Sequence, residues 1–183
     1  AMLSAVKTYA EQCYNSVSCT MDISSGTMVL SFSAAGATDT QLTAYRSYTL
    51  SAAIAVHDQL WTSGSITAEM SEYEKARVYY DWICQNCAYD YSAGDSSLSH
   101  IPYALFHDGT AVCDGYTGAY NLLLKLEGIS CRGLSNASHI WTVATLDGTE
   151  YHIDTTWGDS SGYSTDYTYF AMTPAQSWSV HTW

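Results

Sequence analysis

The stretch ALFHDGTAVCDGYTGAYNLLLKLEGI, residues 104–129, decides the fold that we predict. A loop of small and polar residues gives way to a strongly apolar helical pattern, and Cys113 lies at the junction. Gly128 is placed to end the predicted helix as a C-cap residue does. The apolar residues that recur at spacings of three and four, and so predict one buried stripe, are Tyr116, Ala119, Tyr120, Leu123 and Leu126.

A cysteine at the start of a helix is well placed for nucleophilic chemistry. The N–H groups of a first helical turn have no partner within the helix, so they favour a thiolate and can bind an oxyanion. Gly115 and Gly118 each weaken the first turns by about 1 kcal/mol relative to alanine. We therefore expect a substrate backbone or a packed strand to approach the helix there. A lone cysteine is more often a buried structural thiol, so this interpretation depends on partners elsewhere in the chain.

Those partners lie in SHIWTVATLDGTEYHIDTTWGD, residues 138–159, where two β-rich runs flank Asp147-Gly148. This dipeptide is a strong signal for a two-residue hairpin loop. With that loop Trp141 faces Asp154, and His139, two residues from Trp141, shares a face with Asp154. A three-residue loop would place His139 and Asp154 on opposite faces. The pattern thus predicts a His–Asp pair on one face of the hairpin.

Cys113, His139 and Asp154 together are the parts of a cysteine-nucleophile triad. The segments that contain them, GTAVCDGYTGAYNLLLKLEGISC, SHIW and YHIDTTWGD, resemble the transglutaminase-like superfamily, a branch of the papain-like cysteine enzymes, in its bacterial form. The three residues fall on that family's Cys, His and Asp positions in the same chain order. The resemblance runs from about Ile66 to the C-terminus and includes EYEKARVYYDWICQNCAYDY and DYTYF.

The resemblance implies an α+β fold in which the nucleophile helix packs on an antiparallel β-sheet. We expect residues 66–183 to form this catalytic core and residues 1–65 to be a mostly helical appendage packed on it, in one compact unit. Two features depart from the family's usual pattern. Asp114 follows the nucleophile, and Ile140 and Thr142 flank Trp141. We expect these departures to affect substrate choice rather than the chemistry.

Composition limits the possible partners. The chain has 183 residues, with 18 Asp and Glu against 6 Lys and Arg, and no cation follows Arg132. Nucleic acid is an unfavourable partner, since phosphate binding needs clustered cations. No apolar run has the length of a membrane span, and the first residues do not form a signal peptide. Frequent tyrosine and scarce lysine are typical of an extracellular bacterial protein, so we expect an exported or cell-surface location.

The remaining cysteines allow several interpretations. Cys13 and Cys19 are close in a loop-like stretch and are our first candidate for a disulfide in an oxidising compartment. Cys84 and Cys87 have a spacing of three in a helical pattern, and one such pair is weak evidence for zinc. A local disulfide, a bond to the N-terminal cysteines and two plain core thiols all remain open. Cys131 is most simply a small buried residue.

Other elements follow from local patterns. Ser71 and Glu74 form a capping box for a helix. Pro174 is expected to close regular structure before an aromatic tail. We predict helices at Leu3–Tyr14 and Thr40–Trp61, strands at Thr27–Ser33, Ile129–Leu134 and residues 168–170, and a loop at Ala88–Ser99 that is either solvated or lines a cleft. Bulky groups on both faces of the hairpin predict two central strands.

The chemistry that we expect is acyl transfer through a thioester on Cys113, with His139 as base and Asp154 orienting it. No cofactor and no metal is expected. His152 lies on the same predicted face and is an alternative base, which the resemblance disfavours. The Cys113 N–H would be one oxyanion donor. His107 is a weaker candidate for the second, against a plain polar surface histidine.

The sequence leaves the fate of the thioester open. Water as the acceptor makes a peptidase or amidase, and a lysine amine makes a protein crosslinker. We expect hydrolysis of a protein or peptide substrate, because bacterial members of the family are more often hydrolytic. A non-catalytic cell-surface binding module is the other class, although an intact triad argues against it. His57, His100 and His181 have no recognisable partners in the sequence and are expected to be structural or exposed.

Overall fold

The computed structural model describes residues 16–34, 36–160 and 165–181. The N-terminal half contains β1 (Ser16–Asp22), β2 (Thr27–Ser33), α2 (Asp39–Thr62), α3 (Glu72–Asn86), β3 (Ala88–Tyr89), the 3₁₀ helix η1 (Leu98–His100), α4 (Pro102–Asp108) and β4 (Thr110–Ala111). The C-terminal half contains α5 (Cys113–Leu126), β5 (Cys131–Ser135), β6 (Ile140–Leu146), β7 (Thr149–Ile153), α6 (Thr155–Gly158), the 3₁₀ helix η2 (Tyr167–Tyr169) and α7 (Pro174–Val180). This mixture confirms the predicted α+β class.

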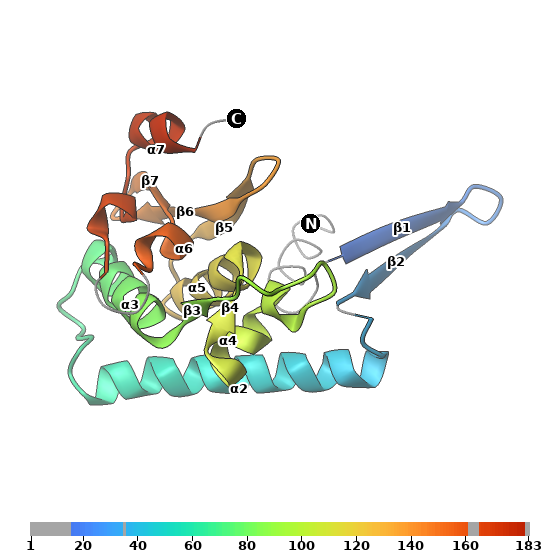
Figure 1. The fold of residues 1–183 in the computed structure, drawn as a ribbon, viewed down its shortest axis with the longest axis horizontal. Helices are drawn as coiled ribbons and strands as arrows, with labels where there is room; N and C mark the ends of the chain where they lie inside the picture. The colour runs from blue at the N-terminus through green and yellow to red at the C-terminus, as the bar shows by residue number, and fades with distance from the viewer. Residues whose placement is uncertain (1–15, 35, 161–164, 182–183) are drawn as a thin grey trace.

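Helix α5 lies at the centre of the fold (Figure 1). The antiparallel sheet β5–β6–β7 lies against it, and α2, α3 and α4 also contact it. Every residue of α5 from Gly115 to Leu124 is buried, and Gly128 follows with a φ of 77°, the left-handed conformation expected after a helix. The predicted nucleophile helix is therefore confirmed as the element around which the others pack.

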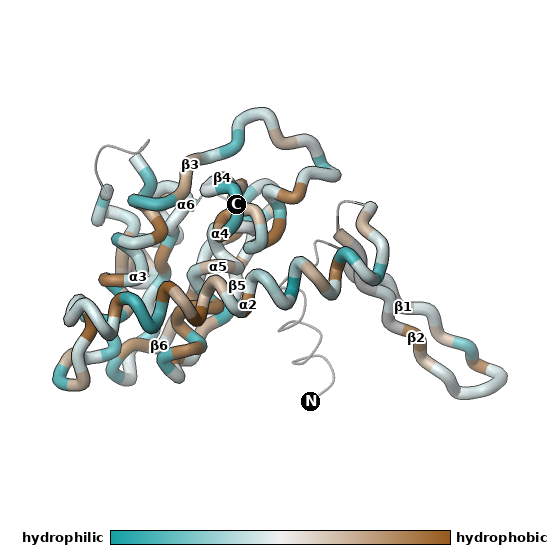
Figure 2. The backbone as a smooth tube through the Cα atoms, turned by 90° about the horizontal axis from the view of Figure 1, so that it is seen from below, coloured by the Kyte–Doolittle hydropathy of each residue, from teal (hydrophilic) through white to brown (hydrophobic). Residues whose placement is uncertain are grey.

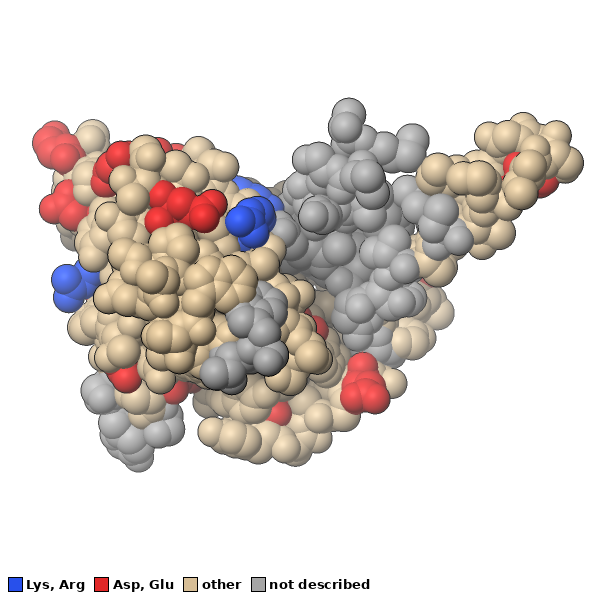
Figure 3. Space-filling view, turned by 90° about the horizontal axis from the view of Figure 1, so that it is seen from above, with Lys and Arg blue, Asp and Glu red and all other residues tan. Residues whose placement is uncertain are grey.

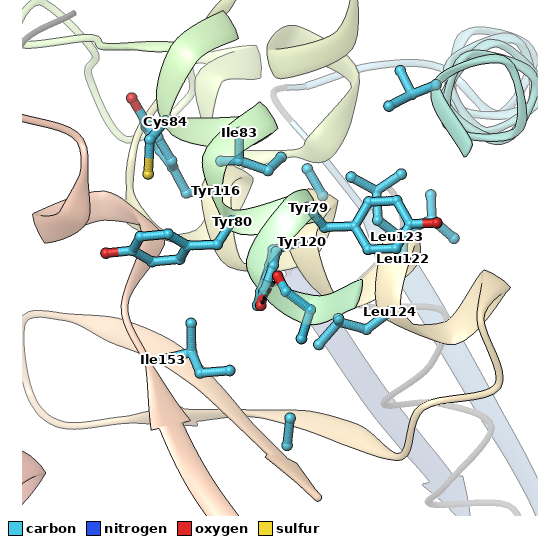
Figure 4. Packing of buried hydrophobic residues seen from close by; sticks show 14 of the residues in the cluster. Tyr79, Tyr80, Ile83, Cys84, Tyr116, Tyr120, Leu122, Leu123, Leu124 and Ile153 are labelled. Atoms are coloured by element: carbon cyan, nitrogen blue, oxygen red, sulfur yellow. Dashed lines mark hydrogen bonds between the residues drawn. The ribbon is translucent and has the colours of Figure 1, made fainter. Parts of the chain in front are cut away.

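Tyrosine hydroxyls are built into this core. Tyr79, Tyr80, Tyr116 and Tyr120 are fully buried between α3 and α5 (Figure 4). Each hydroxyl has an acceptor, as a buried polar group requires. The acceptors are Glu127 Oε1 at 2.7 Å for Tyr79, the Asp166 carbonyl at 2.7 Å for Tyr80, Asp159 Oδ2 at 2.5 Å for Tyr116 and the Ala76 carbonyl at 2.9 Å for Tyr120. The high tyrosine content thus serves the interior as well as the surface.

The β6–β7 hairpin has the predicted register. Leu146 pairs with Thr149 and Thr142 with Ile153, so the loop is Asp147-Gly148, with φ angles of 49° and 80°. The Asp147 carboxylate also accepts the N–H groups of Glu72 and Tyr73 at 3.0 and 3.2 Å, which caps the start of α3. The turn that sets the register therefore also fixes the hairpin to the helical layer.

The N-terminal part contributes a long helix and a separate hairpin. Helix α2 begins with a capping box of Thr38 and Gln41 and buries Ala53 and Val56 in the main core. The β1–β2 hairpin extends away from the body of the protein in both views (Figures 1 and 2). The predicted helix at Leu3–Tyr14 lies outside the described residues. None of the described helices combines the length and apolar character that crossing a membrane would require.

Several expectations about the sheet and the C-terminal segment are wrong. Only β6 is central, whereas β7 forms an edge that makes a single bridge to Met172. Residues 167–169 form η2 instead of a strand. Pro174 begins α7 rather than closing regular structure, because Thr173 caps the helix and Gln176 completes a capping box.

A buried carboxylate joins α2, α3 and the end of α5. The Glu127 side chain is 4% exposed, and Lys75 Nζ and His57 Nε2 both lie 3.2 Å from its oxygens. Trp61 Nε1 donates to Oε1 at 2.6 Å, beside the Tyr79 hydroxyl. Burial alone would raise the pKa of Glu127, but hydrogen bonds from Tyr79, Trp61 and Lys75 outweigh it and lower the pKa. Donors from α2 and α3 therefore stabilise the charged form.

Replacing Glu127 with alanine should lower the free energy of unfolding by about 3 kcal/mol, because Lys75 and the buried donors would lose their acceptor. Glu150, an exposed residue 3.7 Å from Arg132, is the matched control. Its replacement by alanine should cost no more than about 0.5 kcal/mol. Urea unfolding monitored by tryptophan fluorescence measures both, and equal losses would contradict a structural role for the Glu127 cluster.

Candidate active site

Cys113 is the first residue of α5, as predicted. The chain reaches it through β4, which pairs in parallel with β3, and through Val112, whose N–H donates to the Ser99 carbonyl at 3.0 Å. The thiol is partly exposed and free. A Cβ at Gly115 would collide with the same Ser99 carbonyl. The close approach that Gly115 predicted is confirmed, and it comes both from η1, through the Ser99 carbonyl, and from strand β4, through the Ala111 side chain.

Asp154 follows β7 and is completely buried. Its backbone N–H donates to the Tyr169 carbonyl at 2.9 Å. Oδ1 accepts the N–H groups of Thr156 and Trp157 at 3.0 and 3.1 Å, so Asp154 is the N-cap of α6. Oδ2 is thereby directed toward the end of the hairpin where His139 lies.

His139 precedes β6 in a turn where the Asn136 side chain accepts its backbone N–H at 2.8 Å. Its Nε2 lies 2.6 Å from Asp154 Oδ2, which confirms the predicted proximity of the two side chains. The ring stacks on Trp157 at 4.6 Å between centroids and with planes 6° apart. Since Nε2 faces Asp154, Nδ1 is the ring nitrogen left for the thiol.

The electrostatics favour a charged His139. Burial lowers its pKa, but hydrogen bonds with Asp154 and with Cys113, and the charges of both groups, raise it to about 9. Burial would likewise raise the pKa of Asp154, yet hydrogen bonds from His139 and His181 keep it below its ordinary value. An imidazolium beside Cys113 and a carboxylate behind it are the charges that a thiolate nucleophile needs.

A second histidine contacts the same carboxylate oxygen. His181, after α7, is fully buried, and its Nε2 lies 2.9 Å from Asp154 Oδ2. This contact was not predicted from the sequence, because 27 residues separate the two side chains and no local pattern relates them. The Thr-Pro-Ala-Gln start of α7 was the available signal, since it predicts a helix that could bring the end of the described chain back onto the sheet.

The other candidate histidines lie elsewhere. His152 is buried and its Nδ1 faces Trp141 Nε1 at 3.0 Å, while the Asp154 carboxylate faces His139 and His181. Burial lowers the pKa of His152. His107 lies on α4, where it contacts Asp108 at 2.7 Å and stacks on Tyr103. Neither arrangement supports a role as base or oxyanion donor.

Asp114 is also paired. His100 Nδ1 lies 3.0 and 2.9 Å from its two carboxylate oxygens, and burial raises the pKa of Asp114. No partner for His100 was recognisable in the sequence, but η1 brings it beside the first turn of α5. A protonated His100 would compensate the negative charge next to the nucleophile.

A cleft of about 700 Å³ opens beside His139. Tyr89 and Tyr91 line it from the segment after α3, which confirms the cleft-lining interpretation of that loop. The remaining lining residues are His139, Thr156, Trp157, Asp159 and Tyr169. On the face seen in Figure 3, basic atoms form only isolated patches, in keeping with the acidic composition. The walls are therefore mainly aromatic, with one carboxylate.

His139, Asp154 and His181 also offer three atoms within 4.8 Å of one another, as metal ligands do. Their two hydrogen bonds to Oδ2 already account for this closeness. Cys84 and Cys87 are buried and form no disulfide, so of the interpretations for these two residues the plain core thiols are confirmed. The expected Cys13–Cys19 disulfide lies outside the part of the chain whose side chains are described.

A cysteine at a helix start, a buried His–Asp pair and an adjacent cleft are typical of cysteine-nucleophile enzymes. The chain belongs to the transglutaminase-like superfamily, whose sequence model matches residues 61–183. The resemblance of the nucleophile and hairpin motifs to this family is thereby confirmed.

Known proteins show more distant similarity. Kyphoscoliosis peptidase from Homo sapiens and that from Mus musculus are each 24% identical over an aligned region that covers 48% of this chain and 16% of the relative. The chain thus spans about a sixth of the length of these curated relatives. A solved structure described as a TGase aligns with a TM-score of 0.49 and 16% identity, over 72% of this chain and 36% of the other.

Replacing Gly115 with alanine should lower the free energy of unfolding by about 2 kcal/mol, because the added methyl group has no room against η1. The Gly94→Ala variant is the control, since a Cβ there meets nothing within 4 Å. Thermal unfolding followed by circular dichroism compares them. A fully stable Gly115→Ala protein would show that α5 does not pack against Ser99 as described.

Proposed function

We propose that this chain is a cysteine-nucleophile acyl-transfer enzyme that acts on peptide or glutamine-type carboxamides and is mainly hydrolytic. The observation that carries the proposal is the buried contact between His139 and Asp154, which keeps an imidazolium next to Cys113. Membership of the transglutaminase-like superfamily supports the same class of chemistry, because that superfamily includes cysteine peptidases and acyltransferases.

In the proposed reaction the Cys113 thiolate attacks the carboxamide carbon and forms a tetrahedral oxyanion. The N–H of Cys113, which has no partner within α5, is one donor to that oxyanion. The oxyanion collapses, the C–N bond breaks, and His139 gives its proton to the leaving amine. Asp154 holds the ring throughout and balances its charge.

The resulting thioester is then cleaved by water. Neutral His139 removes a proton from water as the oxygen attacks the acyl carbon, and the thiolate leaves as the carboxylic acid forms. An amine in place of water would give a new amide, which is the crosslinking alternative. The similarity to proteins named kyphoscoliosis peptidase supports the hydrolytic choice.

The cleft favours an extended peptide next to His139. Trp157 and Tyr89 offer flat apolar walls, and Asp159 adds an acceptor. Aromatic walls bury the apolar parts of a peptide without requiring a charged substrate. We therefore propose a protein or peptide substrate, bound with its scissile carboxamide between Cys113 and His139.

Cys113 should be alkylated by iodoacetamide at about pH 6, where an ordinary thiol with a pKa of about 8.5 is unreactive. Replacing His139 with alanine should slow this reaction roughly 100-fold, because the imidazolium that favours the thiolate is lost. Peptide mapping measures the rate, with Cys84, Cys87 and Cys131 as internal controls.

The His152→Ala variant is the matched control for this experiment and should retain most of the Cys113 reactivity. Circular dichroism checks that both variants fold, since His152 is buried. A large loss for His152→Ala together with no loss for His139→Ala would reverse the assignment of the base. If Cys113 in the wild-type protein is alkylated no faster at about pH 6 than an ordinary thiol, the enzymatic proposal is contradicted.

Hydrolysis and amine transfer can be separated with glutaminyl peptides. We expect the free acid to remain the main product when a primary amine is added at millimolar concentration, because the open cleft admits water to the thioester. Mass spectrometry distinguishes the acid from the amide conjugate. A predominant conjugate that disappears in the Cys113→Ala variant would instead establish the crosslinking alternative.

A further inference from the structure

His181 is a buried histidine for which the mechanism above has no use. Its side chain is fully buried after α7, with Nε2 2.9 Å from Asp154 Oδ2. The same oxygen receives His139 Nε2 at 2.6 Å. One carboxylate oxygen therefore lies between two imidazole rings, one of which faces Cys113 and one of which does not.

The ring of His181 is held by stacking. Trp141 lies parallel to it, with centroids 3.9 Å apart and planes 6° apart. Trp157 stacks nearby at 4.5 Å, and the His139 ring lies 5.7 Å away at 15°. The two tryptophan and two histidine rings thus form one roughly parallel stack, and stacking of this kind fixes the plane in which the His181 N–H points.

Ser177, on α7, fixes the other edge of the ring. Its hydroxyl lies 3.0 Å from His181 Nδ1 and 2.8 Å from His152 Nδ1. Trp141 Nε1 can only donate, so His152 Nδ1 must accept and His152 carries its proton on Nε2. His181 Nδ1 also lies 3.1 Å from the Ser177 carbonyl, which can only accept, so Nδ1 donates there. A carboxylate oxygen also only accepts, so the contact with Asp154 Oδ2 requires a second proton, on Nε2.

We propose that His181 is a positioning residue that acts through Asp154: it donates from Nε2 to Oδ2 and fixes the carboxylate in the orientation that serves His139. Helix α7 would then complete the site from the far side of the hairpin, without touching the substrate. The catalytic consequence rests on the proposed function, whereas the hydrogen bond itself does not.

The titratable side chains that face Asp154 determine how its charge depends on pH. His139 and His181 approach from the start of β6 and the end of α7, and Tyr80 and Cys84 face it from α3. Burial raises the pKa values of Tyr80 and Cys84 far above neutrality, so both stay uncharged. Of these four side chains, only the two histidines therefore stabilise the negative charge of Asp154.

Removing the His181 donor should raise the pKa of Asp154, because one of the hydrogen bonds that lower it is lost. Asp154 would then be protonated at a higher pH, and support for the His139 imidazolium would fail earlier on acidification. The acid limb of the Cys113 alkylation profile should move up by about one pH unit in a His181→Phe variant. Phenylalanine keeps the ring between Trp141 and Trp157 but has no N–H.

The His181→Gln variant is the matched rescue, since its amide can donate to Asp154 without the ring. We expect it to recover most of the wild-type alkylation profile, with circular dichroism confirming that both variants fold. An unchanged profile in His181→Phe overturns the inference. A His181→Gln profile as impaired as that of His181→Phe also overturns it, because the ring rather than the donor would then matter.

Nitrogen NMR of the ¹⁵N-histidine-labelled wild-type protein tests the hydrogen bond without any reaction at Cys113. The inference requires a proton on His181 Nε2, and its signal should shift in the Asp154→Asn variant. A proton on Nδ1 with a bare Nε2 overturns the inference even if Cys113 is fully reactive. If Cys113 is inert while Nε2 carries the proton, the proposed function fails and the positioning contact stands.

Discussion

The site depends on the burial of one carboxylate. A charged Asp154 with no exposed surface is stable only if its oxygens are hydrogen-bonded. Backbone donors of α6 satisfy one oxygen, and two histidines satisfy the other. Each donor comes from an element that must be correctly packed, so the chemistry of the site and the assembly of the sheet with α6 and α7 are coupled.

Other acidic side chains of the protein are likewise stabilised by hydrogen-bond donors. Asp159 accepts the Tyr116 hydroxyl and Glu127 accepts that of Tyr79, while at the surface the exposed Asp147 caps α3. These acidic groups are saturated by hydrogen-bond donors rather than by many cations, which are scarce in this chain. A polar, tyrosine-rich core of this kind fixes the relative positions of α3, α5 and the hairpin, because each hydroxyl has one suitable acceptor. The geometry of Cys113 relative to His139 follows from that fixed frame.

Local sequence patterns predicted those parts of the site that depend on turns and helix ends. The Asp147-Gly148 loop set the hairpin register, and the register placed His139 beside Asp154. The capping box at Ser71 and the Cys113 helix were predictable for the same reason. Family membership confirmed the resemblance seen in these motifs. The assignment of catalytic roles to the three residues remains a prediction.

Contacts between distant segments were not predictable from local patterns. His181 reaches Asp154 only because α7 folds back over the hairpin, and the capping signal at Thr173 went unused. His100 meets Asp114 through η1, which has no apolar periodicity to reveal it. The strand expected at residues 168–170 did not form because residues 167–169 make η2, which Asp166 caps by accepting the Thr168 N–H. Such features depend on tertiary packing, which overrides local propensity.

The central claim is that Asp154 keeps His139 charged beside Cys113, and the most direct test is a pH titration of the His139 ring by ¹⁵N NMR. The account predicts that the ring retains both protons up to a pKa of about 9. It also predicts a lower value in the Cys113→Ala variant, where the contribution of the thiolate is lost. A wild-type His139 that titrates near the ordinary value of 6.5 would contradict the account.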